Sequence, residues 1–360
     1  MLVETRFDVG VGMKEDIKFG IALPFHPWEE ILKRAKMAEE LGFDSIWMAD
    51  HLVGMGLRRL DAMEAYTSLA AVAMVTKKVK LGTSVTNIQT RHPAVLAQTI
   101  MTLDHISNGR VIAAVGAGEA MSIVPFGILW DKPVSRMKEA IEVILSLWTK
   151  DPVNYDGKFF RLRDAFIRPK PVQKPHSPLW IAANSPRTLK ITAKYGDGWL
   201  PLGRIPEDYK KKLEELENLR RKYDMSGEFD YGVLLYGVVV QDDETAGRII
   251  EFPARVFSVF AAEELKRKGI EVPEELSLEK FVYTPENVRK IMEYASKISF
   301  DDVEEFYVWG SPETCIDKLE KWIKAGAQHI VLVALVSEKY RDMQYKLYGE
   351  KIIPYFKEQY

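Results

Sequence analysis

The sequence predicts an α/β fold of the (β/α)8 TIM-barrel class. Eight short apolar segments alternate with amphipathic helical segments along the 360 residues. The apolar segments are mostly continuous, which is typical of parallel strands that helices cover. A doubly wound sheet is the alternative, but the turn after the first apolar segment reads ALPFHPWEE and lacks the G-x-G-x-x-G pattern expected there.

The first strand-helix unit follows a predicted N-terminal tail, residues 1–16. IKFGIAL, residues 17–23, has the composition of a buried strand. Apolar residues of the next segment recur at the helical period, at Ile31, Ala35, Ala38 and Leu41. Pro27 suits the first turn of this helix and Gly42 the position after its end.

The same unit repeats along the rest of the chain. We predict the remaining strands at residues 43–50, 79–86, 110–118, 178–183, 196–201, 231–241 and 329–335. We predict the helices between them near residues 62–75, 93–106, 137–148, 186–195, 206–223 and 311–326. Residues 17–360 are therefore expected to form a single barrel domain.

Two segments interrupt this pattern. Residues 151–178 contain a YDG turn signal and clustered prolines, which indicate a small hairpin and a surface loop. Residues 245–300 are charged and helical without an obvious strand, which predicts an inserted helical segment.

Composition excludes several classes of function. Lys+Arg 50 against Asp+Glu 52 gives a formal charge of -2, which argues against a nucleic-acid partner. The single cysteine, Cys315, excludes an internal disulfide and cysteine-based zinc motifs, and the six histidines show no metal-ligand spacing. No apolar run approaches the roughly 20 residues of a membrane span. We therefore expect a cytoplasmic protein without a metal, acting on a small molecule.

Polar residues gather after the predicted strands, where TIM barrels carry their active sites. Asp50 and His51 follow the second strand, and Glu119 follows the fourth within VGAGEA. A histidine and a carboxylate facing one pocket can serve as general acid and base. No Ser/His/Asp arrangement, H-E-x-x-H motif or phosphate-binding loop occurs, so an organic cofactor is expected to supply the chemistry.

The strand ends also have structural interpretations that the sequence leaves open. Asp50 could cap the segment after it, and the glycines of GAGE could simply end a strand. Within AANSPRTL, residues 182–189, an Asn or Ser could cap a helix, or the exposed amides could bind a phosphate beside Arg187.

Several stretches together resemble the bacterial-luciferase-like superfamily, and more narrowly its branch that uses the deazaflavin coenzyme F420. These stretches are FGIALP, AEELGFDSIWMADH, KLGTSVTNIQTRHPAVLAQ, GRVIAAVGAGEA, LWIAANSPRTLKITAKYGDGW and GSPETCIDKLEKWIKAGAQHIVL. They span most of the chain. The resemblance implies a luciferase-like TIM barrel with insertions that transfers hydride between F420 and a small carbon substrate.

The resemblance also implies roles for individual residues. His51 and Glu119 would be the acid-base pair, and a cis peptide between Ser84 and Val85 would support the cofactor ring. Cofactor contacts would come from Asp50, Ser84, Val85, Thr86, Asn87, Gly116, Ala117, Gly118, Ala183, Asn184, Ser185, Arg187 and Thr188.

The specific activity stays open at this point. Methylenetetrahydromethanopterin reductase is our first hypothesis, and an F420-dependent secondary-alcohol or sugar dehydrogenase is the second. The lysine that sugar-phosphate dehydrogenases carry after GDGW falls on Ile205, beside Arg204. The alternatives of another class are an FMN-dependent luciferase-like monooxygenase and a catalytically silent flavin-binding protein. Family membership further implies a homodimer.

Overall fold

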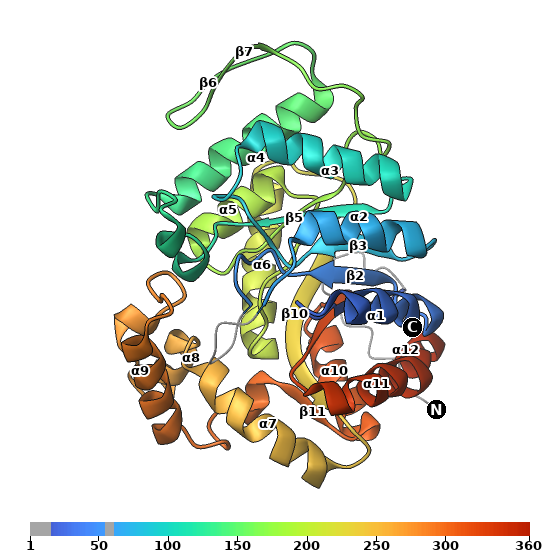
Figure 1. Ribbon diagram of the computed structural model, residues 1–360, viewed down its shortest axis with the longest axis vertical. Helices are drawn as coiled ribbons and strands as arrows, with labels where there is room; N and C mark the ends of the chain where they lie inside the picture. The colour runs from blue at the N-terminus through green and yellow to red at the C-terminus, as the bar shows by residue number, and fades with distance from the viewer. Residues whose placement is uncertain (1–15, 55–60) are drawn as a thin grey trace.

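Eight parallel strands close into a barrel in the computed structural model, which describes residues 16–54 and 61–360 (Figure 1). Each strand pairs with the next and the last with the first, in the order β1 (Lys18–Ala22), β2 (Ser45–Met48), β3 (Lys80–Thr83), β5 (Val111–Gly116), β8 (Leu179–Ile181), β9 (Gly198–Trp199), β10 (Asp230–Val239) and β12 (His329–Ala334). The predicted TIM barrel is confirmed. The predicted tail lies, apart from Asp16, outside the described residues.

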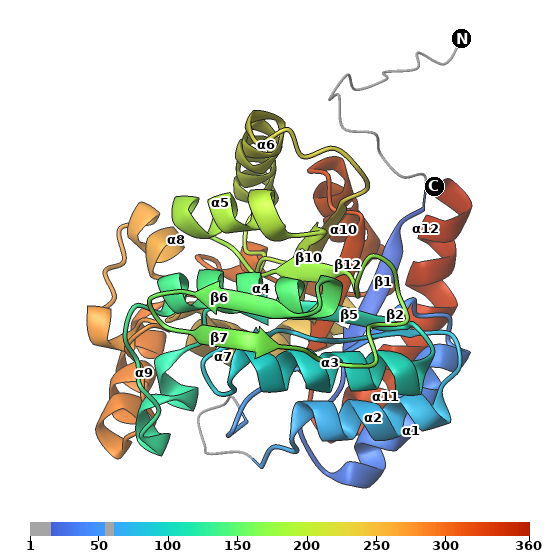
Figure 2. The same ribbon diagram turned by 90° about the horizontal axis from the view of Figure 1, so that it is seen from above.

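Helices surround the barrel and follow the strands as predicted (Figures 1 and 2). They are α1 (Trp28–Glu40), α2 (Ala65–Val75), α3 (Pro93–Ser107), α4 (Pro133–Thr149), α5 (Pro186–Tyr195), α6 (Pro206–Lys222) and α10 (Pro312–Lys324). Five of these begin with proline, whose fixed φ suits a first helical turn. The chain ends in α11 (Glu338–Leu347), a π-helical turn (Tyr348–Ile352) and α12 (Ile353–Gln359).

The interior of the barrel is packed around two tryptophans, Trp47 and Trp180, whose rings lie 5.5 Å apart. Glycines on neighbouring strands make room for them. A Cβ atom at Gly82 would lie 2.5 Å from the Trp47 ring, and one at Gly198 would lie 2.4 Å from the Trp180 ring. Because large and small side chains alternate here, this level of the barrel is filled.

The two predicted interruptions are helical and hairpin segments. The strands β6 (Val153–Asp156) and β7 (Arg161–Ala165) pair antiparallel, which confirms the hairpin. The predicted helical insertion contains α7 (Asp243–Ser258), α8 (Ala262–Arg267) and α9 (Pro285–Lys297), which lie together beside the barrel (Figure 1). They pack on their own apolar cluster, which includes Ile250, Leu265, Phe281 and Ile291.

Several short elements have no counterpart in the prediction. The strand β4 (Thr86–Asn87) pairs with β5, and β11 (Val308–Gly310) pairs with the end of β10. Single 3-10 turns occupy Ala120–Ser122, Val124–Phe126, Glu274–Leu276 and Glu304–Phe306. Segments of two or three residues are too short to show a hydrophobic period. Within the described ranges, no helix has the length and apolar character of a membrane span.

Candidate active site

A cavity of about 280 Å³, here called the polar cavity, opens where β2, β3, β5 and β8 end. Eleven of the predicted site residues line it: Asp50, His51, Ser84, Val85, Thr86, Asn87, Gly116, Ala117, Gly118, Glu119 and Asn184. Four turns that are distant in sequence therefore meet around one space, because parallel strands of a barrel end at the same face.

His51 and Glu119 meet in the wall of this cavity. Their side chains are 12% and 18% exposed, and His51 Nδ1 lies 2.7 Å from Glu119 Oε1. The Ser122 hydroxyl, from the turn after Glu119, donates a hydrogen bond of 3.0 Å to the same carboxylate oxygen. The ring of Phe25 packs edge-on against the imidazole. Both groups are therefore held in fixed orientations.

The two groups shift each other's pKa. Burial by itself would lower the pKa of His51, but the charge and hydrogen bond of Glu119 outweigh it, so the pKa of His51 is raised. Burial would raise the pKa of Glu119, but the charge and hydrogen bond of His51 outweigh it, so the pKa of Glu119 is lowered. The contact between the two groups therefore favours their charged forms, an imidazolium beside a carboxylate.

The turn after β3 forms a second wall. The peptide between Ser84 and Val85 is cis, as the resemblance implied. The Asp50 carboxylate holds the following residues, because it accepts a hydrogen bond of 3.1 Å from the Asn87 amide. Arg91 donates two hydrogen bonds, of 2.6 and 2.9 Å, to the same carboxylate. Asp50 thus has a positioning role that the sequence did not reveal, since its partner lies 41 residues away.

The residues of this cavity fit a flat heterocyclic cofactor. The Asn87 amide nitrogen Nδ2 is buried and has no hydrogen-bond partner among the described residues. A buried amide group without a partner is costly, so a ligand acceptor is expected there. A Cβ atom at Gly118, whose φ is +90°, would lie 2.5 Å from Asn87 Oδ1. Any side chain at residue 118 would therefore displace Asn87, and glycine keeps the Asn87 amide in its place in the cavity wall.

The turn after β8 differs in part from the prediction. Asn184 lines the polar cavity, together with Ala182 instead of Ala183. Ala183 is 2% exposed, and its carbonyl accepts a hydrogen bond from the Trp199 indole. Side chains of neighbouring residues in an extended chain point to opposite sides, so Ala182 and Asn184 face the cavity and Ala183 between them faces away.

The start of α5 carries the other predicted contacts. Ser185 and Thr188 form a reciprocal capping box, in which each side chain accepts the backbone N–H of the other residue. Arg187 donates a hydrogen bond to the Ser135 hydroxyl on α4. None of the three lines the polar cavity, so their cofactor contacts stay predictions.

Further residues of the polar cavity were not predicted. Arg204 is 8% exposed, donates to the Tyr307 hydroxyl at 3.3 Å, and forms no ion pair within the described ranges. Burial raises the pKa of Tyr236 to about 12, so its phenol stays protonated. Phe257 and Leu278 come from the helical insertion. Of these residues, only Arg204 could have been noticed in the sequence, because it lies next to Ile205, where sugar-phosphate dehydrogenases carry a lysine.

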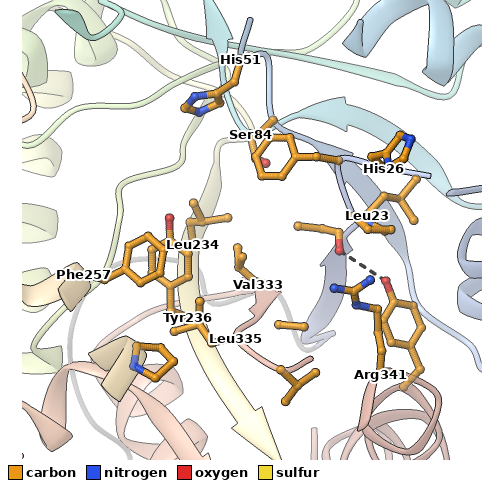
Figure 3. Close-up of a pocket in the computed structure, with 18 of the residues that line it drawn as sticks. Leu23, His26, His51, Ser84, Leu234, Tyr236, Phe257, Val333, Leu335 and Arg341 are labelled. Atoms are coloured by element: carbon orange, nitrogen blue, oxygen red, sulfur yellow. Dashed lines mark hydrogen bonds between the residues drawn. The ribbon is translucent and has the colours of Figure 1, made fainter. Parts of the chain in front are cut away.

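A larger cavity of about 500 Å³, here called the apolar cavity, adjoins the first. The two share His51, Ser84, Leu234, Tyr236 and Phe257. In Figure 3, His51 and Ser84 lie in the upper part of the view, Val333 and Leu335 lie below them, and Arg341 lies at the lower right. Its lining is mostly aliphatic and aromatic. Cavities of this size and composition are typical of small-molecule sites.

Comparisons with known proteins agree with this fold. The profile of the luciferase-like monooxygenase family matches residues 4–329. The 5,10-methylenetetrahydromethanopterin reductase of Archaeoglobus fulgidus is 28% identical and covers 95% of this chain and 100% of its own length. The F420-dependent glucose-6-phosphate dehydrogenase of Nakamurella multipartita is 29% identical over 94% of this chain and 96% of its own.

A solved structure is also similar to this chain over most of its length. An F420-dependent secondary alcohol dehydrogenase, in complex with an F420-acetone adduct, superimposes with a TM-score of 0.80 at 26% identity, covering 94% of this chain and 98% of its own. Among the described residues, no group of three or more His, Cys, Asp or Glu side chains is placed to hold a metal ion. With the family profile spanning most of its length, the chain belongs to the luciferase-like monooxygenase family.

Proposed function

We propose that the protein is an F420-dependent oxidoreductase of small carbon substrates. The observation that carries this proposal is the His51–Glu119 pair, 2.7 Å apart, in the wall of the polar cavity, where His51 also lines the apolar cavity. Coenzyme F420, when bound, supplies a ring carbon that accepts or donates hydride. Similarity to F420-dependent enzymes over nearly the whole chain supports the choice of cofactor.

The polar cavity would hold the deazaflavin ring. Asn87 would donate its unpartnered amide hydrogens to the ring, and Gly116 and Gly118, which line the cavity without side chains, would contact it through their backbone. Asn184, at the end of β8, would bind the part of the cofactor beyond the ring. Ser185, Arg187 and Thr188 are proposed to contact its phosphate at the start of α5.

His51 would manage the substrate proton. In the direction of reduction the imidazolium donates a proton to the substrate heteroatom, and in the direction of oxidation the imidazole accepts it. Glu119 stabilises the positive charge and orients the ring through its hydrogen bond to Nδ1. Since Nδ1 is engaged, Nε2 is the atom that exchanges the proton. Tyr236, protonated at neutral pH, would donate a second hydrogen bond to the substrate.

The apolar cavity would receive the substrate. Its aliphatic and aromatic lining suits a flat, weakly polar group better than a sugar, because buried sugar hydroxyls need hydrogen-bond partners. We keep methylenetetrahydromethanopterin reductase as the first specific hypothesis because the chain is similar to the Archaeoglobus fulgidus reductase. A secondary-alcohol dehydrogenase is the second, because the structurally similar alcohol dehydrogenase contains an adduct of F420 with acetone.

Titration with two cofactors tests the proposal. F420 should bind the purified protein and change in absorbance and fluorescence, whereas FMN should bind at least about tenfold more weakly, a difference of about 1.4 kcal/mol. Tight binding of FMN without binding of F420 would contradict the proposal and favour an FMN-dependent monooxygenase. Uptake of F420 without a redox change, when methylenetetrahydromethanopterin and small secondary alcohols are added, would favour a silent binding protein.

We also propose that the protein is a cytoplasmic homodimer. The single, buried Cys315 suits a reducing compartment. Met74 on α2 and Val95 and Ile106 on α3 are large apolar side chains exposed on neighbouring helices, which is a common feature of subunit interfaces. Light scattering on the purified protein should give twice the mass of 41.2 kDa. The monomer mass would contradict the dimer.

A further inference from the structure

Arg204 is a buried cation in the wall of the polar cavity. The residue is 8% exposed and lies between β9 and α6, whereas the four turns that would hold the ring follow β2, β3, β5 and β8. It also lines a smaller cavity of about 20 Å³, which shares Asn184 and Leu202 with the polar cavity. Arg204 thus belongs to a part of the lining that has no role in the proposed cofactor site.

Two tyrosine rings and one hydroxyl group hold the guanidinium of Arg204. Its central carbon lies 5.9 Å from the centre of the Tyr236 ring and 5.8 Å from that of the Tyr307 ring. The Tyr307 hydroxyl accepts a hydrogen bond of 3.3 Å from Arg204 and donates one of 3.0 Å to the Ala254 carbonyl on α7. Among the described residues, no other hydrogen bond forms at this guanidinium, so most of its N–H donors have no protein partner.

The charge of Arg204 is not balanced by the rest of the polar cavity. His51 pairs with Glu119, and Asp50 pairs with Arg91, so these charges cancel. Among the described residues of this lining, Arg204 is therefore the one charge without a counter-charge. A buried charge is costly unless a group of opposite charge accompanies it, which favours an anionic ligand at this position.

The smaller cavity contains carboxylates, but these have a partner of their own. Asp208, on α6, accepts a hydrogen bond of 2.9 Å from Arg267 on α8, and Glu264 lies 4.0 Å from the same guanidinium. Lys212, also in this lining, adds a further positive charge. Neither carboxylate forms an ion pair with Arg204, which therefore stays available to an anion in the polar cavity.

Tyr236 connects Arg204 with the apolar cavity. Both Tyr236 and His51 line the two cavities. Burial raises the pKa of Tyr236 to about 12, the charge of Arg204 works against this rise, and the charge of Glu119 adds to it. Both charged groups therefore lie near the Tyr236 phenol. A substrate that extends from the apolar cavity past this phenol meets the guanidinium of Arg204.

We propose that Arg204 binds a carboxylate group of the substrate. This inference rests on the proposed function and narrows its substrate class. A carboxylate has one negative charge and a planar pair of oxygens, which match a single guanidinium held beside two aromatic rings. A phosphate group carries more negative charge and would need further cations than the described lining of the polar cavity offers.

Of the two specific hypotheses, a carboxylate site favours the second, with a secondary alcohol that is also an acid. In the oxidation of such a hydroxy acid, the hydride of the alcohol carbon passes to the ring carbon of F420. The hydroxyl proton passes to His51 as the carbonyl group forms, and the carboxylate is unchanged.

Calorimetric titration of the F420-loaded protein tests this inference. The probes are 2-oxopentanoate, its uncharged amide and inorganic phosphate, none of which can pass hydride to oxidised F420. The wild type should bind the oxo acid at least about tenfold more tightly than the amide, and phosphate more weakly than the oxo acid. In Arg204→Met, affinity for the oxo acid should fall by at least about tenfold, to that of the amide, while affinity for the amide and for F420 stays within about threefold.

A matched control removes a buried arginine elsewhere. Arg220, on α6, is 6% exposed, and its guanidinium lies 4.0 Å from the centre of the Phe229 ring, but it lines neither the polar nor the apolar cavity. Arg220→Met should keep the preference for the oxo acid. Arg204→Lys, which keeps the charge but loses the planar fork, should give an intermediate loss. The comparison of acid with amide in the wild type needs no variant, so the test stays valid if Arg204→Met folds poorly.

The outcomes separate the two proposals. Equal affinity for acid and amide in a wild type that binds F420 would overturn the carboxylate site and leave the proposed function standing. Equal weakening of both probes in Arg204→Met would also overturn the site, since Arg204 would then act through packing. Phosphate binding that is tighter than binding of the oxo acid, and that is lost in Arg204→Met, would overturn the choice of a carboxylate. Failure of F420 to bind the wild type would overturn the proposed function itself.

Discussion

The polar and apolar cavities share a wall but are built from different parts of the chain. The polar cavity is formed mainly by turns that directly follow four barrel strands, and it contains an ion pair, a cis peptide and an unpartnered amide. The apolar cavity takes much of its lining from β10, β12, α7 and α11, with mostly aliphatic and aromatic side chains. The comparison teaches that the polar cavity is specified by short motifs, whereas the apolar cavity is specified by packing.

The largest expected effect is loss of turnover without loss of cofactor binding. His51→Ala removes the proposed proton donor, and Glu119→Gln removes the charge that holds it. Each should lower kcat by about 10²- to 10⁴-fold, the usual contribution of general acid-base catalysis, with F420 affinity within about threefold of wild type. Stopped-flow kinetics and fluorescence titration measure the two quantities.

His105→Ala is the control for that prediction, because His105 is an exposed histidine on the outer helix α3. It should leave both quantities unchanged. If His51→Ala abolishes F420 binding and not only turnover, the imidazole belongs to the cofactor site, and the assignment of the shared wall is wrong.

Closing the polar cavity should give the next largest effect. Gly118→Ala places a Cβ atom 2.5 Å from Asn87 Oδ1 at a φ of +90°, which side chains rarely adopt. F420 affinity should fall by at least about tenfold, or about 1.4 kcal/mol. Gly127→Ala is a matched control, since Gly127 also has a positive φ but no atom near the added Cβ. Unchanged affinity in Gly118→Ala would show that the ring does not approach this backbone.

The third effect is on pH dependence. Glu119 raises the pKa of His51, so steps that need the imidazolium should persist above its ordinary value and fail only as the pH rises through the raised pKa. In Glu119→Gln the alkaline limb of the kcat profile should move to lower pH, because the charge and hydrogen bond of Glu119 that raise the pKa of His51 are then lost. An alkaline limb that does not move would show that Glu119 is not the group that sets the pKa of His51.

The His51–Glu119 pair should also affect the free energy of unfolding, and its two members should do so with opposite dependence on pH. The raised pKa of His51 contributes stability below its unfolded value of 6.5, and that contribution is lost as pH rises through the folded value. The lowered pKa of Glu119 contributes stability above 4.5, and that contribution is lost as pH falls through its folded value. The wild type should therefore exceed Glu119→Gln in free energy of unfolding most clearly between those two values, as urea denaturation at several pH values can measure.

The smallest effect concerns the apolar cavity alone. Leu335→Ser removes apolar surface from a residue that lines only this cavity. The KM for the substrate should rise by about threefold to tenfold, as expected for lost apolar burial, while F420 affinity stays constant. Leu129→Ser, at an exposed leucine that lines neither cavity, controls for a general effect on folding. A change in F420 affinity instead of KM would remove the distinction between the two cavities.

The sequence predicted the barrel well because its signals are local. Each strand is a short apolar run, each helix has its own period, and prolines mark the helix starts. The meeting of His51 with Glu119 could be predicted from the resemblance and from the rule that parallel strands end together.

The remaining features depend on contacts between distant residues. Asp50 and Arg91 form an ion pair, but no fixed spacing in the sequence marks them as partners. The same is true of Arg204 and the two rings that it contacts, Tyr236 and Tyr307. Phe257 and Leu278 line the polar cavity from the helical insertion, and no sequence motif predicts how that insertion packs.

A crystal structure of the protein soaked with F420 tests the central claim most directly. The account predicts density for the deazaflavin ring in the polar cavity, against the Ser84–Val85 peptide, with its reactive edge facing His51 and the apolar cavity left free above it. A ring bound in the apolar cavity, or outside the barrel with the His51–Glu119 pair facing solvent, would contradict it.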